Sequence, residues 1–513
     1  MFEDFKRKIE YALGKQNKKD ETSSSIPISS SITENMIRLR EQFSNSADLN
    51  KREMEIGNSR ILLVSCEGMI NSQILALSIV KPLSELSRNK NLSSGELRDF
   101  FMNKSILSVE QREIFEFDTL FTAMMAGFVI IFIEGEQIAF ALAAHGFQFR
   151  SISEPSNEAN ELGPKEAFTE PLRINLSMIR RRIKSPKLQF ELMSVGKQSK
   201  TDLCLIYLSD KTSAQLIREV RKKLTKINLD VVLDSSYVRP YLENHPLSLF
   251  SSVGNTERPD VLCGKINEGR IAILVDGSPY ALIVPYLFSE NFKSFDDYAR
   301  RPYFSTFVRI LKYISFYLSF ILPGAYVGIT TFHPELLPYS LLLTVASSEE
   351  IIPFSLMVEA LFIYLIFEIM REAGIRLPSA VGHTIGIVGA LVIGDAAVNA
   401  GLIGAPMVIV VAITAICAFS IPQLYEPTTM LRFVFIIIGG LSGLYGVALA
   451  TALVCGIICS MNSLHIPMSA PISPVDARWM SDSILFAGVR KNSGKKLKIQ
   501  NINGSEIKDE EEI

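Results

Sequence analysis

A fall in the fraction of charged residues along the chain constrains its fold more than any other feature. Only 14 of the 174 residues from Tyr303 to Asp476 are Asp, Glu, Lys or Arg, about 8%, whereas the other 339 residues carry such side chains at about 27%. A soluble domain is typically about 25% charged, and a membrane span needs about 20 predominantly apolar residues. The contrast predicts a soluble N-terminal head followed by an α-helical polytopic membrane domain at 299–468.

The charge-poor stretch divides into apolar runs. Four spans are predicted near 310–329, 353–370, 380–393 and 406–424. A last run, 433–461, is too long for one comfortable span and short for two. Its glycines indicate two short helices or a re-entrant hairpin: they are Gly439, Gly440, Gly443 and Gly446.

Basic residues between these runs predict the orientation, because Lys and Arg concentrate in cytoplasmic loops. They precede the first span, follow the second, precede the last run and recur in the tail: Arg300, Arg301, Arg309, Arg371, Arg376, Arg432, Arg490, Lys491, Lys495, Lys496 and Lys498. The loops 330–352 and 394–404 contain neither Lys nor Arg. The head and both termini are therefore predicted to be cytoplasmic, including a charged tail at 469–513. Because the chain then enters and leaves the run 433–461 on the same side, the hairpin is favoured for that run.

The head contains an internal repeat. Strand-like runs at 61–66 and 203–208 are separated by 142 residues, and two hairpin-like segments, 128–144 and 270–285, show the same offset. Equal offsets for two features predict two tandem α/β subdomains. The predicted boundaries are a polar, disordered tail at 1–58, subdomains at 59–150 and 199–298, and a linker at 151–198.

A basic cluster lies in the predicted linker, at Arg180, Arg181 and Arg182. Such a cluster can contact a phosphate group or an acidic neighbour. A solvated helix face accounts for it equally well. A subunit interface would satisfy both interpretations, so these three residues are interface candidates.

No residue pattern points to catalysis, a metal or a cofactor. The sequence has no phosphate-binding loop, nucleophile elbow or HExxH motif, and its five histidines lack ligand spacing. The six cysteines lack zinc-finger spacing. The formal net charge of −2 disfavours a nucleic-acid binder. The chain is therefore predicted to be non-enzymatic.

Two acidic residues, Glu359 and Glu368, lie inside the second predicted span. A carboxylate at membrane depth is costly and usually faces a bundle interior or a wet cavity. Nine residues of separation put the two on opposite sides of a helix. Glu368 has Arg371 at i+3, which predicts a structural ion pair, and leaves Glu359 as the functional candidate.

The face of Glu359 suggests a pore. It also carries Phe362, Ile363, Ile366 and Met370. Repeated around an oligomer axis, these side chains would form a cation-attracting ring above a hydrophobic gate. An acid bonded to the backbone or hydroxyls of a neighbouring helix is an equal alternative.

Several longer residue strings are more specific than helix, strand or loop formation alone requires, and they can identify a protein family. They are Asn255-Thr-Glu-Arg-Pro-Asp260, Glu268-Gly-Arg-Ile-Ala-Ile-Leu-Val-Asp-Gly277, Phe295-Asp-Asp-Tyr298, Thr331-Phe-His-Pro-Glu335 and Arg371-Glu-Ala-Gly-Ile-Arg-Leu-Pro378. In order and spacing the chain resembles the A subunits of GerA-type spore germinant receptors.

The resemblance implies an integral protein of the spore inner membrane. It implies a transporter-like, nutrient-binding B subunit and a C-subunit lipoprotein as partners, with self-association, as a pentamer, into a nutrient-gated cation channel. The residues alone also permit a secondary transporter that binds substrate at a broken helix, or a membrane-anchored scaffold.

Overall fold

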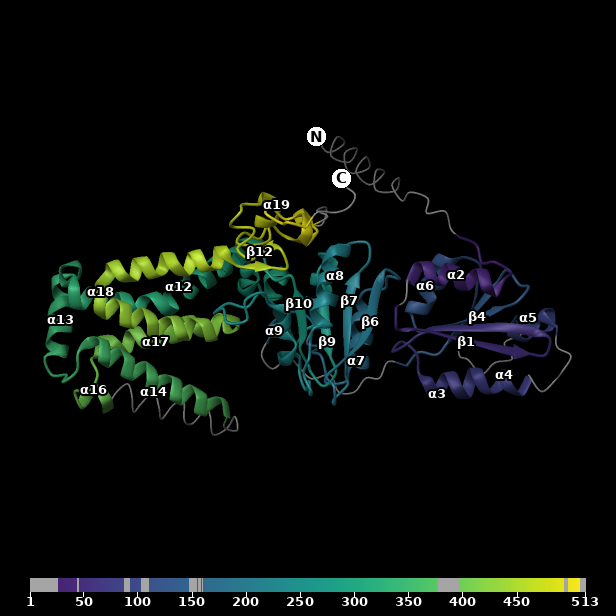
Figure 1. The fold of residues 1–513 in the computed structure, drawn as a ribbon, viewed down its shortest axis with the longest axis horizontal. Coiled ribbons are helices and arrows are strands. Elements are labelled where there is room, and N and C mark those ends of the chain that lie inside the picture. Colours follow the sequence, from purple (N-terminus) through teal and green to yellow (C-terminus); the bar gives the residue numbers. More distant parts are fainter. Residues whose placement is uncertain are drawn as a thin grey trace, which may run out of the picture.

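Two five-stranded antiparallel sheets and a bundle of long helices lie in a row along the molecule (Figure 1). The computed structural model describes residues 26–507, except 44–45, 87–92, 103–109, 147–154, 156–157, 159, 377–395 and 493–496. The second sheet lies between the first sheet and the helical bundle. The predicted fold class is confirmed: an α/β head of two subdomains is followed by a helical part with apolar helices.

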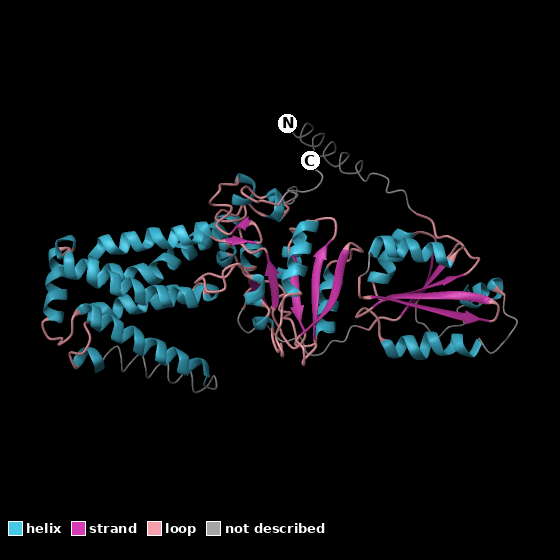
Figure 2. Ribbon diagram, in the orientation of Figure 1, coloured by secondary structure: helices cyan, strands magenta, loops and turns pink. Residues whose placement is uncertain are grey.

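Both faces of the first sheet are covered by helices (Figure 2). The strand order is β1 (Leu49–Ile56), β2 (Ser59–Cys66), β4 (Phe128–Ile133), β5 (Ala139–Ala143) and β3 (Gln111–Ile114). Side chains alternate between the faces of a strand. Leu62 and Val64 therefore pack towards α2 (Ile32–Phe43) and α6 (Phe117–Met125). Ile61 and Leu63 pack towards α3 (Ser72–Ile74), η1 (Leu75–Val80), α4 (Lys81–Leu86) and α5 (Ser94–Met102).

The second sheet repeats this order. Its strands are β6 (Leu188–Val195), β7 (Thr201–Leu208), β9 (Ile271–Val275), β10 (Ala281–Val284) and β8 (Gly254–Thr256). Helices α7 (Leu172–Arg182) and α10 (Pro259–Asn267) cover one face. The other face packs against α8 (Ala214–Leu224) and α9 (Arg239–Leu242), and η2 (Ser235–Tyr237) lies just before α9.

Two segments predicted to lie outside the subdomains belong to them. The predicted tail at 1–58 contains α2 and β1, and the predicted linker at 151–198 contains α7 and β6. Each pair supplies a helix and an edge strand of one sheet. The edge strand β1 leaves most of its side chains exposed. Its sequence, Leu49-Asn-Lys-Arg-Glu-Met-Glu-Ile56, therefore has the composition of a polar tail.

The C-terminal segment from residue 462 packs on the second subdomain, and its part from 469 onwards was predicted to be a charged tail. It contains β11 (Asn462–Ser463), β12 (Ile466–Pro467), α19 (Ala477–Met480), α20 (Val489–Asn492) and η7 (Ile499–Asn501). Trp479, Ile499, Ile502 and Ile507 enter the same core as β7 and β9. These apolar residues stand singly among polar ones, so composition did not reveal them.

In the described part of the bundle the longer helices are α12 (Pro302–Phe332), α13 (Tyr339–Glu349), α14 (Leu356–Arg376), α17 (Ala405–Phe419) and α18 (Tyr425–Ser460). Short elements adjoin them: η3 (Phe288–Phe292), α11 (Asp296–Ala299), η4 (Pro334–Leu336), α16 (Ala397–Asn399) and η6 (Pro422–Leu424). Two helical segments of the described chain, Pro302–Phe332 and Pro422–Ser460, are long and apolar enough to cross a membrane, by length and composition alone. The span predicted at 380–393 lies outside the described residues.

The last apolar run folds back on itself at Gly443. This residue has φ 61° and ψ −156° within α18, a conformation that glycine adopts readily. Tyr286 contacts the chain on both sides of the helix: its hydroxyl lies 3.3 Å from Gln423 Oε1, and its N–H donates to Ser463 Oγ at 3.1 Å. A straight helix of 36 residues would separate its ends by about 54 Å. The two arms therefore run antiparallel.

Both arms, 425–442 and 444–460, pack along α12. A Cβ added to Gly324 would lie 2.4 Å from the Phe435 carbonyl oxygen of the first arm, so the two backbones are in close contact. In the second arm, Cys455 Sγ lies 3.9 Å from the hydroxyl of Tyr317.

Candidate functional site

Glu359 lies in the first turn of α14, with 1% of its surface exposed. Its Oε1 accepts the backbone N–H of Gly404 at 2.8 Å, and Gly404 immediately precedes α17. The first N–H groups of a helix lack partners within the helix, and a helix N-terminus favours negative charge. The carboxylate therefore caps α17 and joins it to α14, which is a bond to the backbone of a neighbouring helix.

The residues of the predicted pore face do not share one environment. Ile363 is fully buried beneath α17. Ile366 and Met370 are partly buried, and Phe362 is 46% exposed. In the single chain, the side of α14 that carries Glu359 and Ile363 thus faces the chain's own helices. Helical spacing identified residues on one side of the helix, but not what lies opposite them.

A different stripe of α14 is exposed. Four apolar side chains at spacings of three and four residues are between 43% and 60% exposed: Val358, Phe362, Leu365 and Ile369. Such spacings place them on one side of the helix. Glu372 and Arg376 continue the stripe and pair at 2.7 Å.

Glu368 and Arg432 together join three helices. Its Oε2 accepts Arg371 Nε at 2.9 Å, and its Oε1 accepts the hydroxyl of Tyr425 at 2.9 Å. Arg432 of α18 is fully buried; its Nη1 lies 3.4 Å from Glu368 Oε1, and its Nε donates to the Ser319 carbonyl of α12 at 3.0 Å. From the sequence, Arg432 served only as a basic residue that indicates the orientation of the spans. That its buried side chain bonds to α12 and α14 was not predicted.

Arg180 of the basic cluster lies at an interface within the chain, between the two subdomains. Arg180 is fully buried, and its Nε donates to Asp48 Oδ2 at 2.7 Å. Asp48 directly precedes β1, so this pair joins the two subdomains. Arg181 and Arg182 each lie 2.6 Å from an oxygen of Glu166. An interface between subunits at these three residues stays a prediction.

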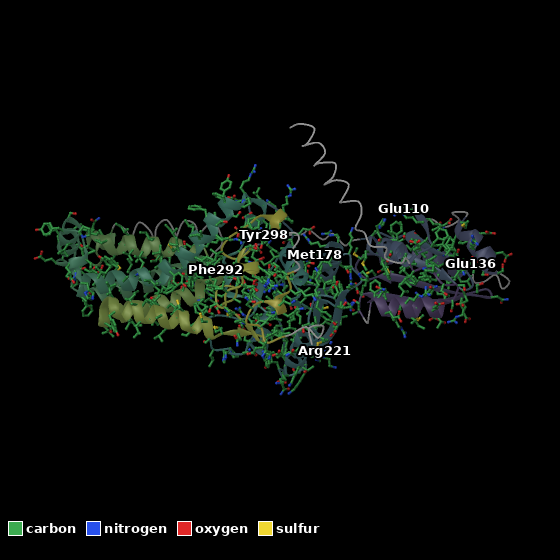
Figure 3. All side chains as sticks on the ribbon, turned by 90° about the horizontal axis from the view of Figure 1, so that it is seen from above. Glu110, Glu136, Met178, Arg221, Phe292 and Tyr298 are labelled. Carbon is green, nitrogen blue, oxygen red and sulfur yellow. The ribbon has the colours of Figure 1, made fainter. Side chains whose placement is uncertain are left out.

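Buried charges also join the head, α12 and the C-terminal segment, in the region where Figure 3 labels Phe292 and Tyr298. Arg309 of α12 is fully buried; its Nε donates to Asp297 Oδ2 at 2.9 Å, and its Nη1 lies 3.4 Å from Asp482. Asp482 also accepts the Tyr298 hydroxyl at 3.0 Å. Sequence reasoning missed this junction network, since its members are up to 185 positions apart; the string around Asp297 was its one signal.

Charge outweighs burial at the acids of this region. Burial alone would raise the pKa of Asp482, but Lys293 and Arg309 lower the pKa below its usual value. The same opposition holds for Glu290: burial would raise its pKa, but Arg270, at 2.5 Å, and other cations lower it. Both carboxylates are therefore held in the ionised form at neutral pH.

The described residues include no group of three or more His, Cys, Asp or Glu side chains placed to hold a metal ion. The arrangements around Glu359, Glu368 and Asp482 join helices and subdomains.

Comparison with known proteins identifies the family. The model described as Bacillus/Clostridium GerA spore germination protein matches residues 37–496. Spore germination protein KA of Bacillus subtilis (strain 168) is 36% identical over 462 residues, which cover 89% of this chain and 84% of that protein. The chain belongs to the GerA family of spore germination proteins. The resemblance inferred from the sequence strings is thereby confirmed.

Other relatives of this GerA-family chain match over a similar extent. Spore germination protein GerLA of Bacillus cereus is 34% identical, covering 88% of this chain and 92% of that protein. The uncharacterized membrane protein YfkQ of Bacillus subtilis (strain 168) is 33% identical and covers 90% of each chain. The crystal structure of the N-terminal domain of the A subunit of the Bacillus megaterium spore germinant receptor GerK3 is 29% identical and covers 52% of this chain and 98% of that one, with a TM-score of 0.42.

Proposed function

We propose that this chain is the A subunit of a nutrient germinant receptor in the spore inner membrane, and that it acts without catalysis. It works with a transporter-like, nutrient-binding B subunit and a C-subunit lipoprotein. The head and both termini lie on the cytoplasmic side. Five copies associate into a channel for cations that opens in response to the nutrient. Family membership and the apolar lengths of α12 and α18 support the membrane placement.

The exposed stripe of α14 carries the channel proposal. Its apolar part is followed by the Glu372–Arg376 ion pair. Ionisable groups in membrane helices usually avoid lipid and face a bundle interior or a wet cavity. The ion pair therefore favours a stripe that faces a water-filled pore over one that faces lipid. Around a symmetry axis, the stripe would place Phe362 and Ile369 at apolar constrictions. Hydrophobic constrictions gate by dewetting, and rings of acidic residues favour cations.

Glu359 has a supporting role in this proposal. By accepting the Gly404 N–H it holds the start of α17 against α14. It thereby fixes the direction in which the stripe of α14 points. Ile363 lies on the same packed side, so its substitution would disturb helix packing rather than open a pore directly.

A leak assay tests the pore assignment. Phe362→Ser should let spores that carry the complete receptor release K⁺ without nutrient, because a polar side chain hydrates an apolar constriction. Leu453→Ser is the matched control: Leu453 lies on α18 and is 62% exposed. If the Phe362 variant reaches wild-type receptor levels, yet neither leaks nor alters the nutrient response, α14 does not line the pore.

Reconstitution separates the channel from the other two functions. The purified oligomer in a planar bilayer should give discrete cation-current steps. Substrate uptake into vesicles without such steps would indicate a secondary transporter. Neither current nor uptake, with normal assembly of the receptor, would indicate a scaffold.

A further inference from the structure

A short loop of the second subdomain exposes two leucines. The loop at 244–250, here called the leucine loop, is part of the connection between α9 and β8 and contains no Asp, Glu, Lys or Arg. Leu247 is fully exposed and Leu249 is 44% exposed, whereas Phe250 is buried. In Figure 1, α9 lies on the side of the second sheet that faces the helical bundle. The two leucines therefore project from a short, uncharged segment beside the bundle.

Contacts of Ser248 and Phe250 fix the level of the leucine loop along the bundle. Ser248 Oγ lies 3.2 Å from Met461 Sδ, and Met461 directly follows the last residue of α18. Phe250 packs against Phe316 of α12 with a ring-centroid distance of 6.4 Å, and against Phe288 at 5.5 Å. The loop thus lies level with the end of the second arm of α18.

The lengths of the two arms of α18 indicate where the leucine loop lies relative to a bilayer. Arms of about 18 and 17 residues rise about 27 and 26 Å, close to the hydrocarbon thickness of about 30 Å. With the turn at Gly443 at one surface, Met461 emerges at the other. The leucine loop, in contact with Met461, then lies at the boundary between acyl chains and headgroups on the side of the head.

The surface next to the loop is also apolar. The second arm exposes Leu453 (62%) and Ile457 (42%), about two turns and one turn before its end. In the proposed placement these side chains face lipid, so the leucine loop continues a lipid-facing surface onto the head. Apolar side chains on an interfacial segment gain stability by entering the outer acyl region, and an uncharged segment enters at low cost.

We propose that the leucine loop inserts Leu247 and Leu249 into the membrane leaflet on the side of the head, with phospholipid acyl chains as its ligand. The insertion seats the second subdomain directly on the bilayer beside α12 and α18. The inference rests on the proposed membrane placement of the helices.

The single tryptophan of the chain makes a direct test available. Trp479 is buried, with 4% of its surface exposed, and supplies a constant background. A second tryptophan is introduced as Leu247→Trp in the full chain, reconstituted in phosphatidylcholine nanodiscs with or without bromine on the acyl chains. Leu453→Trp reports on the membrane helices. Leu233→Trp is the control for an exposed leucine of the same subdomain, since Leu233 is 64% exposed.

The control lies away from the bundle. Leu233 is close to Ser235, whose Oγ accepts the Ser278 hydroxyl at 3.0 Å in the β9–β10 turn. That turn is at the opposite end of β9 from Arg270, which binds Glu290 next to the bundle.

Brominated lipid should quench the added emission at Leu247→Trp and Leu453→Trp, but not at Leu233→Trp. Quenching at Leu453 without quenching at Leu247 would overturn the insertion and leave the membrane placement intact. A blue-shifted but unquenched emission at Leu247 would also overturn it, because a protein surface would then cover the loop. Absence of quenching at Leu453 would overturn the membrane placement itself, and the insertion with it.

Discussion

Removal of the Arg180 side chain should strongly destabilise the head. Arg180 Nε lies 2.7 Å from Asp48 Oδ2, and the two side chains are 0% and 5% exposed. In Arg180→Met, the Asp48 carboxylate stays buried at the boundary of the subdomains. Among the described residues, its remaining side-chain donors are uncharged: the hydroxyl of Ser46 at 2.5 Å and the thiol of Cys66 at 3.1 Å.

The expected magnitude follows from burial. Loss of one member of a buried ion pair costs about 3–5 kcal/mol, because the remaining charge is desolvated and unpaired. A matched pair crosses the same boundary at the surface: Arg173 and Glu67 lie 2.9 Å apart with side chains 51% and 38% exposed. Such pairs contribute about 1 kcal/mol or less, so Arg173→Met should have a small effect. Arg180→Met combined with Asp48→Leu should recover part of the loss, because no unpaired charge remains.

Urea unfolding of the purified full chain in detergent measures these differences. Trp479 belongs to the core of the second subdomain and reports its unfolding by fluorescence. With a denaturant dependence of about 2 kcal/mol per molar urea, Arg180→Met should lower the midpoint by roughly 1.5–2.5 M and Arg173→Met by at most about 0.5 M. The reasoning from burial is refuted if the two single variants shift the midpoint equally, or if the double variant is less stable than Arg180→Met.

Three further outcomes are expected. Gly443→Ala should abolish the monodisperse size-exclusion peak of the solubilised chain, because φ 61° costs an alanine about 1–3 kcal/mol and its Cβ would lie 3.1 Å from Phe332. Gly456→Ala is the control: no atom lies within 4 Å of the added Cβ, so the peak should stay unchanged. Glu359→Leu should lower the melting temperature, because an unpaired buried N–H costs roughly 1–3 kcal/mol of stability. Glu359→Gln keeps an acceptor for the Gly404 N–H and should lower the melting temperature less. Equal melting temperatures of the two variants would contradict the capping of α17. Because the pKa of Glu290 is lowered in the folded chain, its stabilisation is complete above its unfolded pKa of about 4.3 and is lost as the pH falls through the folded value; Glu290→Gln should flatten the fall of the urea midpoint below about pH 4.3, and an unchanged slope would count against this assignment.

The buried strands of both sheets were predictable because they form uninterrupted apolar runs at a constant offset. Residues 61–66 and 203–208 became β2 and β7, which occupy equivalent positions in the two sheets. The edge strand β1 was missed for the converse reason. An edge strand of this kind exposes charged side chains between its apolar ones, as Lys51 and Arg52 do in β1, and composition alone cannot separate it from a polar tail.

The candidate site shows where periodicity stops being informative. Spacing placed Glu359 and Ile363 on one side of α14 and Glu368 beside Arg371. It could not show that Gly404, 45 positions later, supplies the partner of Glu359. The same limit applies to Arg432, whose partners in α12 and α14 are 113 and 64 positions away. Contacts of that separation depend on how helices pack, which a single sequence does not encode locally.

Both ends of the bundle are attached to the second sheet, and this determines which movements of the head reach the helices. About two turns into α12, Arg309 binds Asp297 of the head and Asp482 of the C-terminal segment. Just after α18, Ser463 Oγ donates to the Ser252 carbonyl at 2.6 Å, so the second arm ends on the same subdomain. A displacement of the second sheet therefore moves the start of α12 and the end of α18 together. A signal that arrives at the first sheet and crosses the Arg180 boundary would act on both helices at once, and α14 would follow through the bonds that Glu368 makes to α18.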